Sequence, residues 1–444
     1  MSRLTLREYQ TEPRVRLSAE ERDALIRSMP SLTMRPSVGL ERHYDLTPSS
    51  HVGAVEVGSL SVSVVPKIPV SRVMFLISYA LDPANWHSGG FNFEEENSLL
   101  EAIIPGFVRQ LQRALRRGVL EGYRTEEASL TTVRGRLRIG DQLRERFGAT
   151  PPAEVTYDEF TEDIEENRLI KAALDRLGSM RIRNRLLGRS LRRFDSALER
   201  VGLVRYDPRS IPEIRYTRLN EHYRPPVELA RLILRSDSYE LRHGAVRGTS
   251  FLVDMNRVFE GFVVVALREA LGVSERSFPQ GARGRRLFLD KGRRVSLEPD
   301  ISWWEGERCA FVGDVKYKAL SESGVVHSDL YQLLSYVIAC DLPGGLLVYG
   351  SGGDVIAHDI ERAGKSLEVI SLDLSSPPEQ ILRNLGELAG RVRNLRMRTS
   401  RSRDHFACSR EGVPGRQDAE SEAQRRPHQR QGLRASGPKK PKLP

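Results

Sequence analysis

The amino-acid sequence predicts an α+β protein of several domains, and three features along the chain support this. Near the N-terminus, apolar residues alternate with other residues at 52–58 and 60–65, which predicts two strands. From residue 246 onward the pattern runs helix, strands, helix, strands, helix, which is typical of an α/β domain with a mixed sheet. Between these regions, apolar residues recur at helical spacing in three segments: 99–117, 167–177 and 227–234.

These patterns divide the chain of 444 residues into four parts. We expect a β-rich N-terminal domain at 1–85, a mainly helical middle region at 86–245, and the α/β domain at 246–396. The last part, 397–444, is rich in Arg, Ser, Gly, Pro and Gln and poor in apolar residues. It is therefore predicted to be a disordered basic tail.

The charge and cysteine content narrow the class of protein. The net charge is +10, but residues 398–444 contain twelve Lys or Arg and five Asp or Glu, so this tail carries +7 of it. The overall positive charge is therefore no proof that the folded part binds nucleic acid. The three cysteines form no CxxC pair, which argues against a zinc site or a disulfide framework and fits a reducing cytoplasm.

Two further classes are excluded by local patterns. The most apolar stretch, 251–273, is interrupted by charged residues such as Asp254 and Arg257, so no membrane span is predicted. Gly364–Lys365–Ser366 ends like a phosphate-binding loop, but Asp359 stands where that motif requires glycine. A cytoplasmic protein that does not itself bind GTP or ATP is expected.

The residues that carry chemistry lie in a predicted hairpin at 295–317. Asp300 falls on the face of the first strand opposite Ile301 and Trp303, and 304–307 is predicted to be the turn. On the second strand, 308–317, Asp314 and Lys316 share one face. Because Asp300 and Asp314 are 14 positions apart, a spacing that suits a hairpin, the strands should bring both carboxylates and the ammonium together.

Two adjacent carboxylates repel each other unless a cation lies between them, and Mg²⁺ prefers oxygen ligands. We therefore predict that Asp300 and Asp314 hold Mg²⁺, with the backbone carbonyl of Val315 as a further ligand. Such an ion lowers the pKa of a bound water and neutralises charge on a phosphate, and Lys316 is placed to orient the water or stabilise the transition state. The alternative is a solvated strand face with a surface ion pair.

Two predicted helices add further candidates. Glu260 lies at the edge of the apolar stripe of a helix at 255–270, so it either points to the metal site or is an exposed glutamate at its rim. Gln332 and Tyr336 share one face of a helix at 329–336. They either contact the metal-bound water and the DNA backbone or form a polar helix face.

Basic residues near the hairpin leave two interpretations open. Lys318, the segment 281–286 and the arginine run at 181–193 could all contact phosphates, because Lys and Arg contacts dominate affinity for nucleic acid. Each could equally be a solvated surface.

Taken together, the Glu260 helix, Pro299–Asp300, Asp314-x-Lys316 and Gln332-xxx-Tyr336 resemble the PD-(D/E)XK nuclease fold. More narrowly, the chain is similar to the McrC family over about residues 45–395. That likeness is carried by segments in the same order along the chain: Pro66–Ile68, Arg134–Arg136, Tyr157–Phe160, Asn167–Lys171, Leu219–Tyr223, Asp254–Glu260, Asp314–Lys318 and Asp329–Gln332.

The resemblance implies a function and partners. It implies a DNA endonuclease that uses Mg²⁺, or Mn²⁺ in its place, with Asp300, Asp314 and Glu260 at the metal and Lys316 as the catalytic cation. It implies docking of the N-terminal region on a hexameric McrB-like AAA+ GTPase, which would bind the GTP, and cleavage of double-stranded DNA carrying 5-methylcytosine. Two alternatives stay open: a catalytically silent adaptor that activates the GTPase, and a stand-alone DNA repair nuclease.

Overall fold

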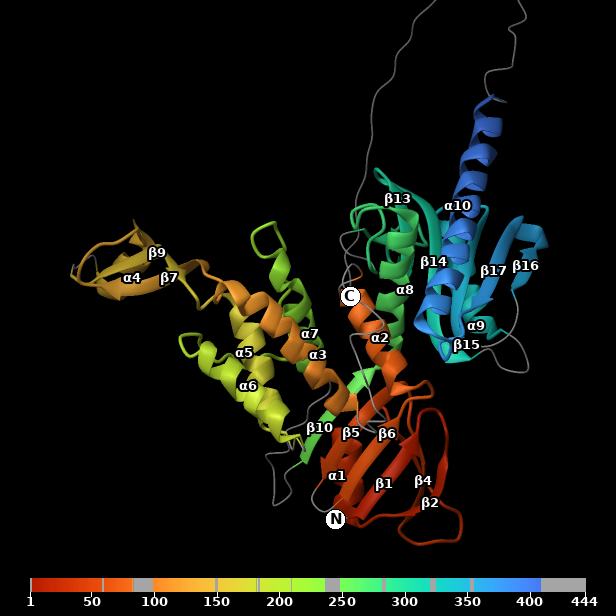
Figure 1. Cartoon of the computed structure of the whole chain (residues 1–444). Helices are drawn as coiled ribbons and strands as arrows, with labels where there is room; N and C mark the ends of the chain where they lie inside the picture. The colour runs from red at the N-terminus through yellow and green to blue at the C-terminus, as the bar shows by residue number, and fades with distance from the viewer. Residues whose placement is uncertain are drawn as a thin grey trace, which may run out of the picture. The chain divides into compact units, whose positions relative to one another are not determined.

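The structure is a computed structural model, shown in Figure 1. Residues up to Ser400 form one compact unit. The residues that the structure describes are 2–57, 60–81, 83, 99–147, 151–180, 182, 184–208, 210–235, 248–281, 285–319, 325–351 and 355–408.

The N-terminal region is built on a four-stranded sheet of order β1-β6-β5-β10. Strands β5 (His51–Val57) and β6 (Leu60–Val65) confirm the predicted pair, and β1 (Ser2–Arg7) runs parallel to β6. Side chains of β6 alternate between buried and half-buried, as expected for a sheet with one covered face. A second, three-stranded sheet has β4 (His43–Thr47) between β2 (Glu12–Arg16) and β3 (Thr33–Pro36).

The fourth strand of the main sheet comes from far along the chain. β10 (Gly248–Asp254) pairs antiparallel with β5, so the N-terminal sheet includes residues that we assigned to the α/β domain beginning at 246. The two strands approach closely, because a Cβ added to Gly53, whose φ is +142°, would lie 2.0 Å from the carbonyl oxygen of Phe251. β10 thus ties the first and last parts of the folded unit together.

One helix belongs to the N-terminal region, and helices then dominate the chain from Val70 to Arg235. The N-terminal helix, α1 (Ala19–Ser28), begins at a capping box formed by Ser18 and Glu21. The later helices are α2 (Val70–Leu81), α3 (Leu99–Ala114), α5 (Glu165–Gly178), α6 (Arg185–Ala197) and α7 (Arg224–Arg235). The α2 helix packs on the last region of the fold, since the rings of Phe75 and Phe262 meet edge to face at 5.3 Å.

A small α/β module interrupts the helices of the middle region. Its three-stranded sheet has the order β7-β9-β8, formed by β7 (Gly122–Leu130), β9 (Ala153–Thr161) and β8 (Arg136–Leu137), and α4 (Ile139–Arg146) accompanies it. The sequence predicted only a mainly helical region here, so the long pairing of β7 with β9 was not predicted.

The last region contains the predicted mixed sheet, with five strands in the order β13-β14-β15-β17-β16. β14 (Arg308–Ala319), β15 (Gly344–Ser351) and β17 (Lys365–Ser371) are parallel to one another. β13 (Ile301–Glu305) and β16 (Ile356–Ile360) run antiparallel to their neighbours at the two edges.

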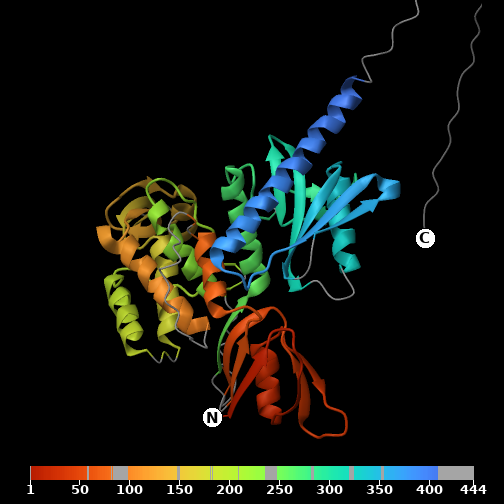
Figure 2. The ribbon, with the colours of Figure 1, turned by 45° about the vertical axis from the view of Figure 1, so that its right-hand side comes forward.

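Helices cover both faces of this sheet (Figure 2). Phe259 and Phe262 of α8 (Met255–Leu271) and Leu385 of α10 (Pro378–Cys408) pack with Val315 and Val348 on one face. On the other face, α9 (His327–Ala339) packs its own apolar residues against Val312, Leu347 and Val369. The sheet therefore holds two separate apolar layers, and β14 passes between them.

The C-terminal helix differs from the composition-based expectation. α10 continues to Cys408, beyond residue 396 where we placed the start of a disordered tail. Val392 and Leu395 remain buried near its middle, and Arg396 of the same helix pairs with Glu305 at 2.5 Å, so packing extends the helix past the predicted boundary. Residues 409–444 of the predicted tail lie outside the described residues. Within the described part of the chain, no helix is long and apolar enough to cross a membrane.

Candidate active site

The β13–β14 hairpin brings the two predicted aspartates together. Ile301 pairs with Gly313, and the backbone N–H of Val315 donates to Oδ2 of Asp300 at 2.9 Å. Asp300 thus lies against the backbone immediately after Asp314, as the 14-residue spacing predicted. The turn is shorter than predicted, because a bulge after Trp303 keeps Trp304 in β13.

Asp314 is the most deeply buried of the candidate residues. Its side chain is 1% exposed, and its polar neighbours among the described residues are the ammonium of Lys316 and the carboxyl group of Asp300, although neither of its oxygens accepts a hydrogen bond of regular geometry. The ammonium of Lys316 forms an ion pair with it, without regular hydrogen-bond geometry. Leaving such a buried polar group unsatisfied costs about 1–3 kcal/mol or more, so native proteins rarely keep one unless something binds there.

The neighbouring acids show how much negative charge is concentrated here. Burial, then the charges of Asp314 and Glu260, raise the pKa of Asp300 to about 8. Burial, then the charge of Asp314, raise the pKa of Glu260 as well. Burial alone would lower the pKa of Lys316, but the Asp314 carboxylate outweighs it and the pKa is raised, so this ammonium stays charged. A bound cation would relieve the repulsion among the three acids.

Glu260 lies near the two aspartates without joining them in a ready-made cage. It is half-buried on α8, and within the described ranges no three His, Cys, Asp or Glu residues are grouped closely enough to hold a metal ion. Mg²⁺ does not require such a cage, because proteins usually hold it with one or two carboxylates and several waters. The pair Asp300 and Asp314 therefore fits Mg²⁺, because the buried carboxylate oxygens of Asp314 accept no regular hydrogen bond.

A cavity of about 970 Å³ lies beside α8, and of the candidate site residues only Glu260 lines it. Glu260 and Arg257 of α8 form part of its wall, and Arg231 and Arg235 of α7 lie among its other lining residues. The lining contains both acidic and basic side chains, so the cavity alone does not define the charge of a ligand.

Helix α9 holds the segment that precedes Asp300. Nε2 of Gln332 donates to Oη of Tyr336 at 2.8 Å, and that hydroxyl donates to the carbonyl of Glu298 at 3.2 Å. This confirms that Gln332 and Tyr336 share a face and shows that they anchor the strand entry. Burial and the charge of Asp314 raise the pKa of Tyr336, so its hydroxyl remains a donor. Contact with a metal-bound water or with DNA stays a prediction.

The basic candidates have local partners. Nζ of Lys318 pairs with Oδ2 of Asp329 at 2.7 Å, and Oη of Tyr349 donates to the same carboxylate at 2.5 Å. This favours the interpretation of Lys318 as a strand-end residue and reveals Asp329, 5% exposed, as an anchor that local sequence pattern did not identify. Arg285 packs over the ring of Trp304 at 4.8 Å.

The other predicted basic positions are in part outside the described residues. Residues 282–284 of the predicted basic segment, and Arg181 and Arg183 of the arginine run, lie outside the described residues. The arginines of the run that belong to α6 are exposed: Arg185, Arg189, Arg192 and Arg193.

Known proteins are similar to this chain in sequence and in structure. A family model described as McrBC 5-methylcytosine restriction system component matches residues 46–350. Among solved structures, a chain from McrB AAA+ hexamers with bound McrC of Thermococcus gammatolerans is 19% identical to this one. The match covers 87% of this chain and 99% of that chain, with a TM-score of 0.48. A chain from the McrBC complex of the same organism is 22% identical to this one. That match covers 61% of this chain and 88% of that chain, with a TM-score of 0.37. No curated protein matches the sequence.

Proposed function

The chain belongs to the family of McrBC 5-methylcytosine restriction system components, and we propose that it is the Mg²⁺-dependent endonuclease subunit of such a system. The observation that carries this proposal is Asp314: a buried carboxylate without regular hydrogen bonds, next to Asp300 and Lys316. The substrate is double-stranded DNA carrying 5-methylcytosine, whose phosphodiester bonds it cleaves.

Asp300 and Asp314 would hold the metal, and Glu260 would add negative charge behind them. When bound, Mg²⁺ supplies an acidified water and neutralises charge on the scissile phosphate. The backbone N–H of Val315 fixes one oxygen of Asp300, which leaves the other oxygen for the ion. Tyr336 holds the strand entry through the carbonyl of Glu298, so the position of Asp300 is determined from both sides.

Lys316 is the cation that acts on the phosphate. In the metal-free chain, the Asp314 carboxylate raises its pKa against the effect of burial, so the side chain carries a positive charge at neutral pH. Its side chain is 24% exposed, compared with 1% for Asp314, so it can reach a ligand from the solvent side. Once a metal balances Asp314, the ammonium is released to stabilise negative charge as the P–O bond breaks.

The partner in this proposal is a McrB-like AAA+ GTPase hexamer. The family resemblance supports docking on such a hexamer, and the absence of a complete phosphate-binding loop from the sequence leaves GTP to the partner. The silent-adaptor alternative gives no reason for three acidic groups and one ammonium to gather in this largely buried place.

The test is a cleavage assay on methylated and unmethylated DNA, with Mg²⁺ or EDTA, with and without the AAA+ partner. Asp314→Asn and Lys316→Met should each reduce cleavage by about 100-fold or more while leaving the stimulation of GTP hydrolysis intact. Asp341→Asn is the matched control, because the Asp341 side chain is 78% exposed. Cleavage at the wild-type rate by either site variant would contradict the proposal.

A further inference from the structure

One lysine of the N-terminal region contacts the catalytic strand directly. Lys67 follows β6, and its Nζ donates to the backbone carbonyl of Tyr317 at 2.8 Å, across 250 positions of sequence. The same ammonium lies 4.0 Å from the centre of the Tyr317 ring. Lys67 is exposed as a residue, whereas Tyr317 is 1% exposed, so the charged end rests on a buried ring.

The carbonyl that Lys67 contacts lies where β14 departs from its neighbour. Lys316 pairs with Tyr349 of β15, but the next pair is Ala319 with Ser351, so β14 has one residue more than β15 between these pairs. Such a bulge leaves backbone groups without ladder partners and changes the direction of nearby side chains. The Lys67 ammonium provides a charge-assisted hydrogen bond to this stretch, one residue after Lys316.

A buried glutamate holds both partners of this contact. Oε2 of Glu8 accepts the backbone N–H of Lys67 at 3.1 Å and the hydroxyl of Tyr317 at 3.3 Å. Glu8 is 3% exposed and follows β1, where its own N–H donates to the carbonyl of Val65. Glu8 therefore fixes Lys67 and Tyr317 relative to each other.

The contact also reaches the helix that carries Glu260. The ring of Tyr317 meets the ring of Phe259, the residue before Glu260, with 5.9 Å between centroids. Tyr317 thus lies between the lysine of the N-terminal region and the two elements that bear Lys316 and Glu260.

We propose that Lys67 is a positioning residue for the nuclease site, fixing the bulge of β14 that directs Lys316 toward the scissile phosphate. This inference rests on the proposed function. A positioning role can be distinguished from a contact that only stabilises the fold. Removing the Lys67 ammonium should slow the chemical step without weakening DNA binding, because Lys67 acts on Lys316 through the backbone. Misplacement of a catalytic group by about 1 Å is enough for large losses in rate.

Arg72 offers a matched control. Its Nε donates to the carbonyl of Ser376 at 2.7 Å, so it also joins the N-terminal part of the chain to the last region through a side chain and a backbone carbonyl. The carbonyl that it contacts lies just before α10 and outside β14. Arg72→Met therefore removes a tether of the same kind without touching the bulge.

The experiment compares steady-state cleavage of methylated DNA by the full chain with its AAA+ partner, for wild type, Lys67→Met, Arg72→Met and Asp314→Asn. Lys67→Met should lower kcat about tenfold and leave KM within about twofold, while Arg72→Met keeps both within about twofold. Because Lys67 is exposed, its variants should fold; Lys67→Gln provides the same test if the Met variant aggregates. Circular dichroism and the melting temperature verify that each variant is folded at the assay temperature.

Each other outcome contradicts the inference in a distinct way. An unchanged kcat in a folded Lys67 variant, with Asp314→Asn inactive, overturns the role of Lys67 and leaves the nuclease proposal standing. Equal losses in the Lys67 and Arg72 variants, or a loss confined to KM, would mean general tethering. A wild-type chain that cleaves no DNA with Mg²⁺ and partner overturns both proposals.

Discussion

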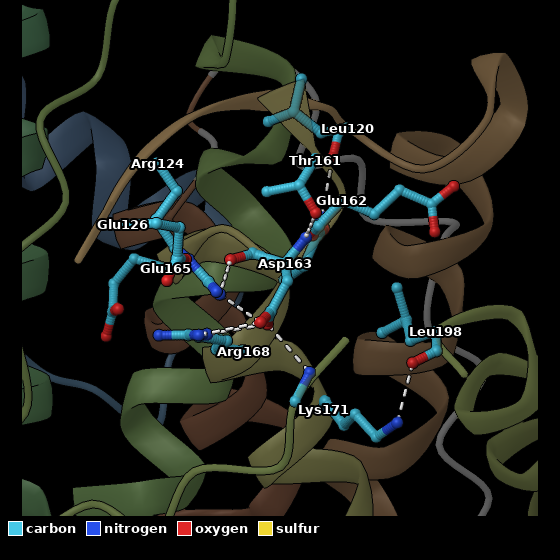
Figure 3. A network of polar contacts seen from close by, with 12 residues as sticks. Leu120, Arg124, Glu126, Thr161, Glu162, Asp163, Glu165, Arg168, Lys171 and Leu198 are labelled. Atoms are coloured by element: carbon cyan, nitrogen blue, oxygen red, sulfur yellow. Dashed lines mark hydrogen bonds and ion pairs between the residues drawn. The ribbon is translucent and has the colours of Figure 1, made fainter. Parts of the chain in front are cut away.

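Asp163 and Asp314 are both largely buried aspartates, yet their surroundings are opposite. Asp163 accepts hydrogen bonds from Nε and Nη2 of Arg168, both at 2.8 Å, from the N–H of Gly202 at 2.8 Å, and from Arg124 (Figure 3). The hydrogen bond with Arg168 contributes most to lowering the pKa of Asp163. Asp314 accepts no regular hydrogen bond from the described residues and has acidic neighbours whose pKa values are raised.

The difference separates a carboxylate that stabilises the fold from one that is available to a ligand. Asp163 follows β9 and precedes α5, and its arginine partners join the small α/β module to the helices. Its charge is fully compensated within the chain. The charge of Asp314 is compensated by Lys316, in a place where Asp300 and Glu260 add two more acidic groups whose pKa values are raised. The two aspartates should therefore respond oppositely to neutralisation.

The largest effect on stability is expected at Asp163. Asp163→Asn leaves Arg124 and Arg168 without their counter-charge and should lower the free energy of unfolding by about 2 kcal/mol. Urea denaturation followed by circular dichroism measures this. Asp175→Asn on the exposed face of α5 is the control and should change it by less than about 0.5 kcal/mol. An unchanged free energy of unfolding in Asp163→Asn would contradict the stabilising role assigned to Asp163.

A smaller effect of opposite sign is expected at the site. In EDTA at pH about 9, where Asp300 is ionised and remains a partner for Lys316, Asp314→Asn relieves the repulsion with Asp300 and Glu260 and should raise the free energy of unfolding by about 1 kcal/mol. The same denaturation experiment shows it. A destabilised Asp314→Asn would mean that the carboxylate serves the fold, as at Asp163.

The pH dependence of stability should distinguish the same two places. The pKa of Asp300 is raised to about 8 in the folded protein, so the folded state holds the proton more tightly than the unfolded chain. Metal-free protein should therefore lose stability as pH rises from the unfolded value of 3.8 to about 8, and Asp300→Asn should reduce this slope. Burial also raises the pKa of Glu8, to about 7, so Glu8 contributes to the same loss of stability with rising pH. The Asp300→Asn variant should keep this contribution.

For Asp163 the sign is reversed. Its lowered pKa means that the stability it contributes is present above the unfolded value of 3.8 and is lost as pH falls through the folded value. Melting curves of wild type and Asp163→Asn should therefore converge in strong acid. A constant gap between them at all pH values would contradict the assignment.

The smallest effect is expected at Tyr336. Tyr336→Phe removes the hydroxyl that donates to Glu298 and accepts from Gln332, so the strand entry before Asp300 loses one anchor. We expect a loss of about 0.5 kcal/mol in stability and a severalfold lower rate of cleavage. Full activity at reduced stability would restrict Tyr336 to a structural role.

Local periodicity predicted the elements that carry the site. Alternation along 301–317 predicted the hairpin of Asp300, Asp314 and Lys316, and helical spacing predicted α8 and α9. These patterns predict the elements because each strand or helix buries one face, which makes apolar residues recur at the spacing of that element. The PD-(D/E)XK assignment of the last region stays a prediction, supported by these residues.

Contacts between distant segments could not be read in the same way. The place of β10 depends on pairing with β5, and the contact of Lys67 with Tyr317 spans 250 positions. The bulge after Trp303 shifts strand parity, which strict alternation cannot show. α10 passes residue 396 because apolar residues up to Leu395 pack on the sheet, although the surrounding composition is basic and polar.

Binding of Mg²⁺ to the chain, measured by isothermal titration calorimetry on wild type, Asp314→Asn and Asp341→Asn, tests most directly whether the orphaned carboxylate is a ligand. Wild type and Asp341→Asn should bind the ion and melt at higher temperature in its presence, and Asp314→Asn should show neither effect. Equal Mg²⁺ binding and equal thermal shifts in all three proteins would contradict the account.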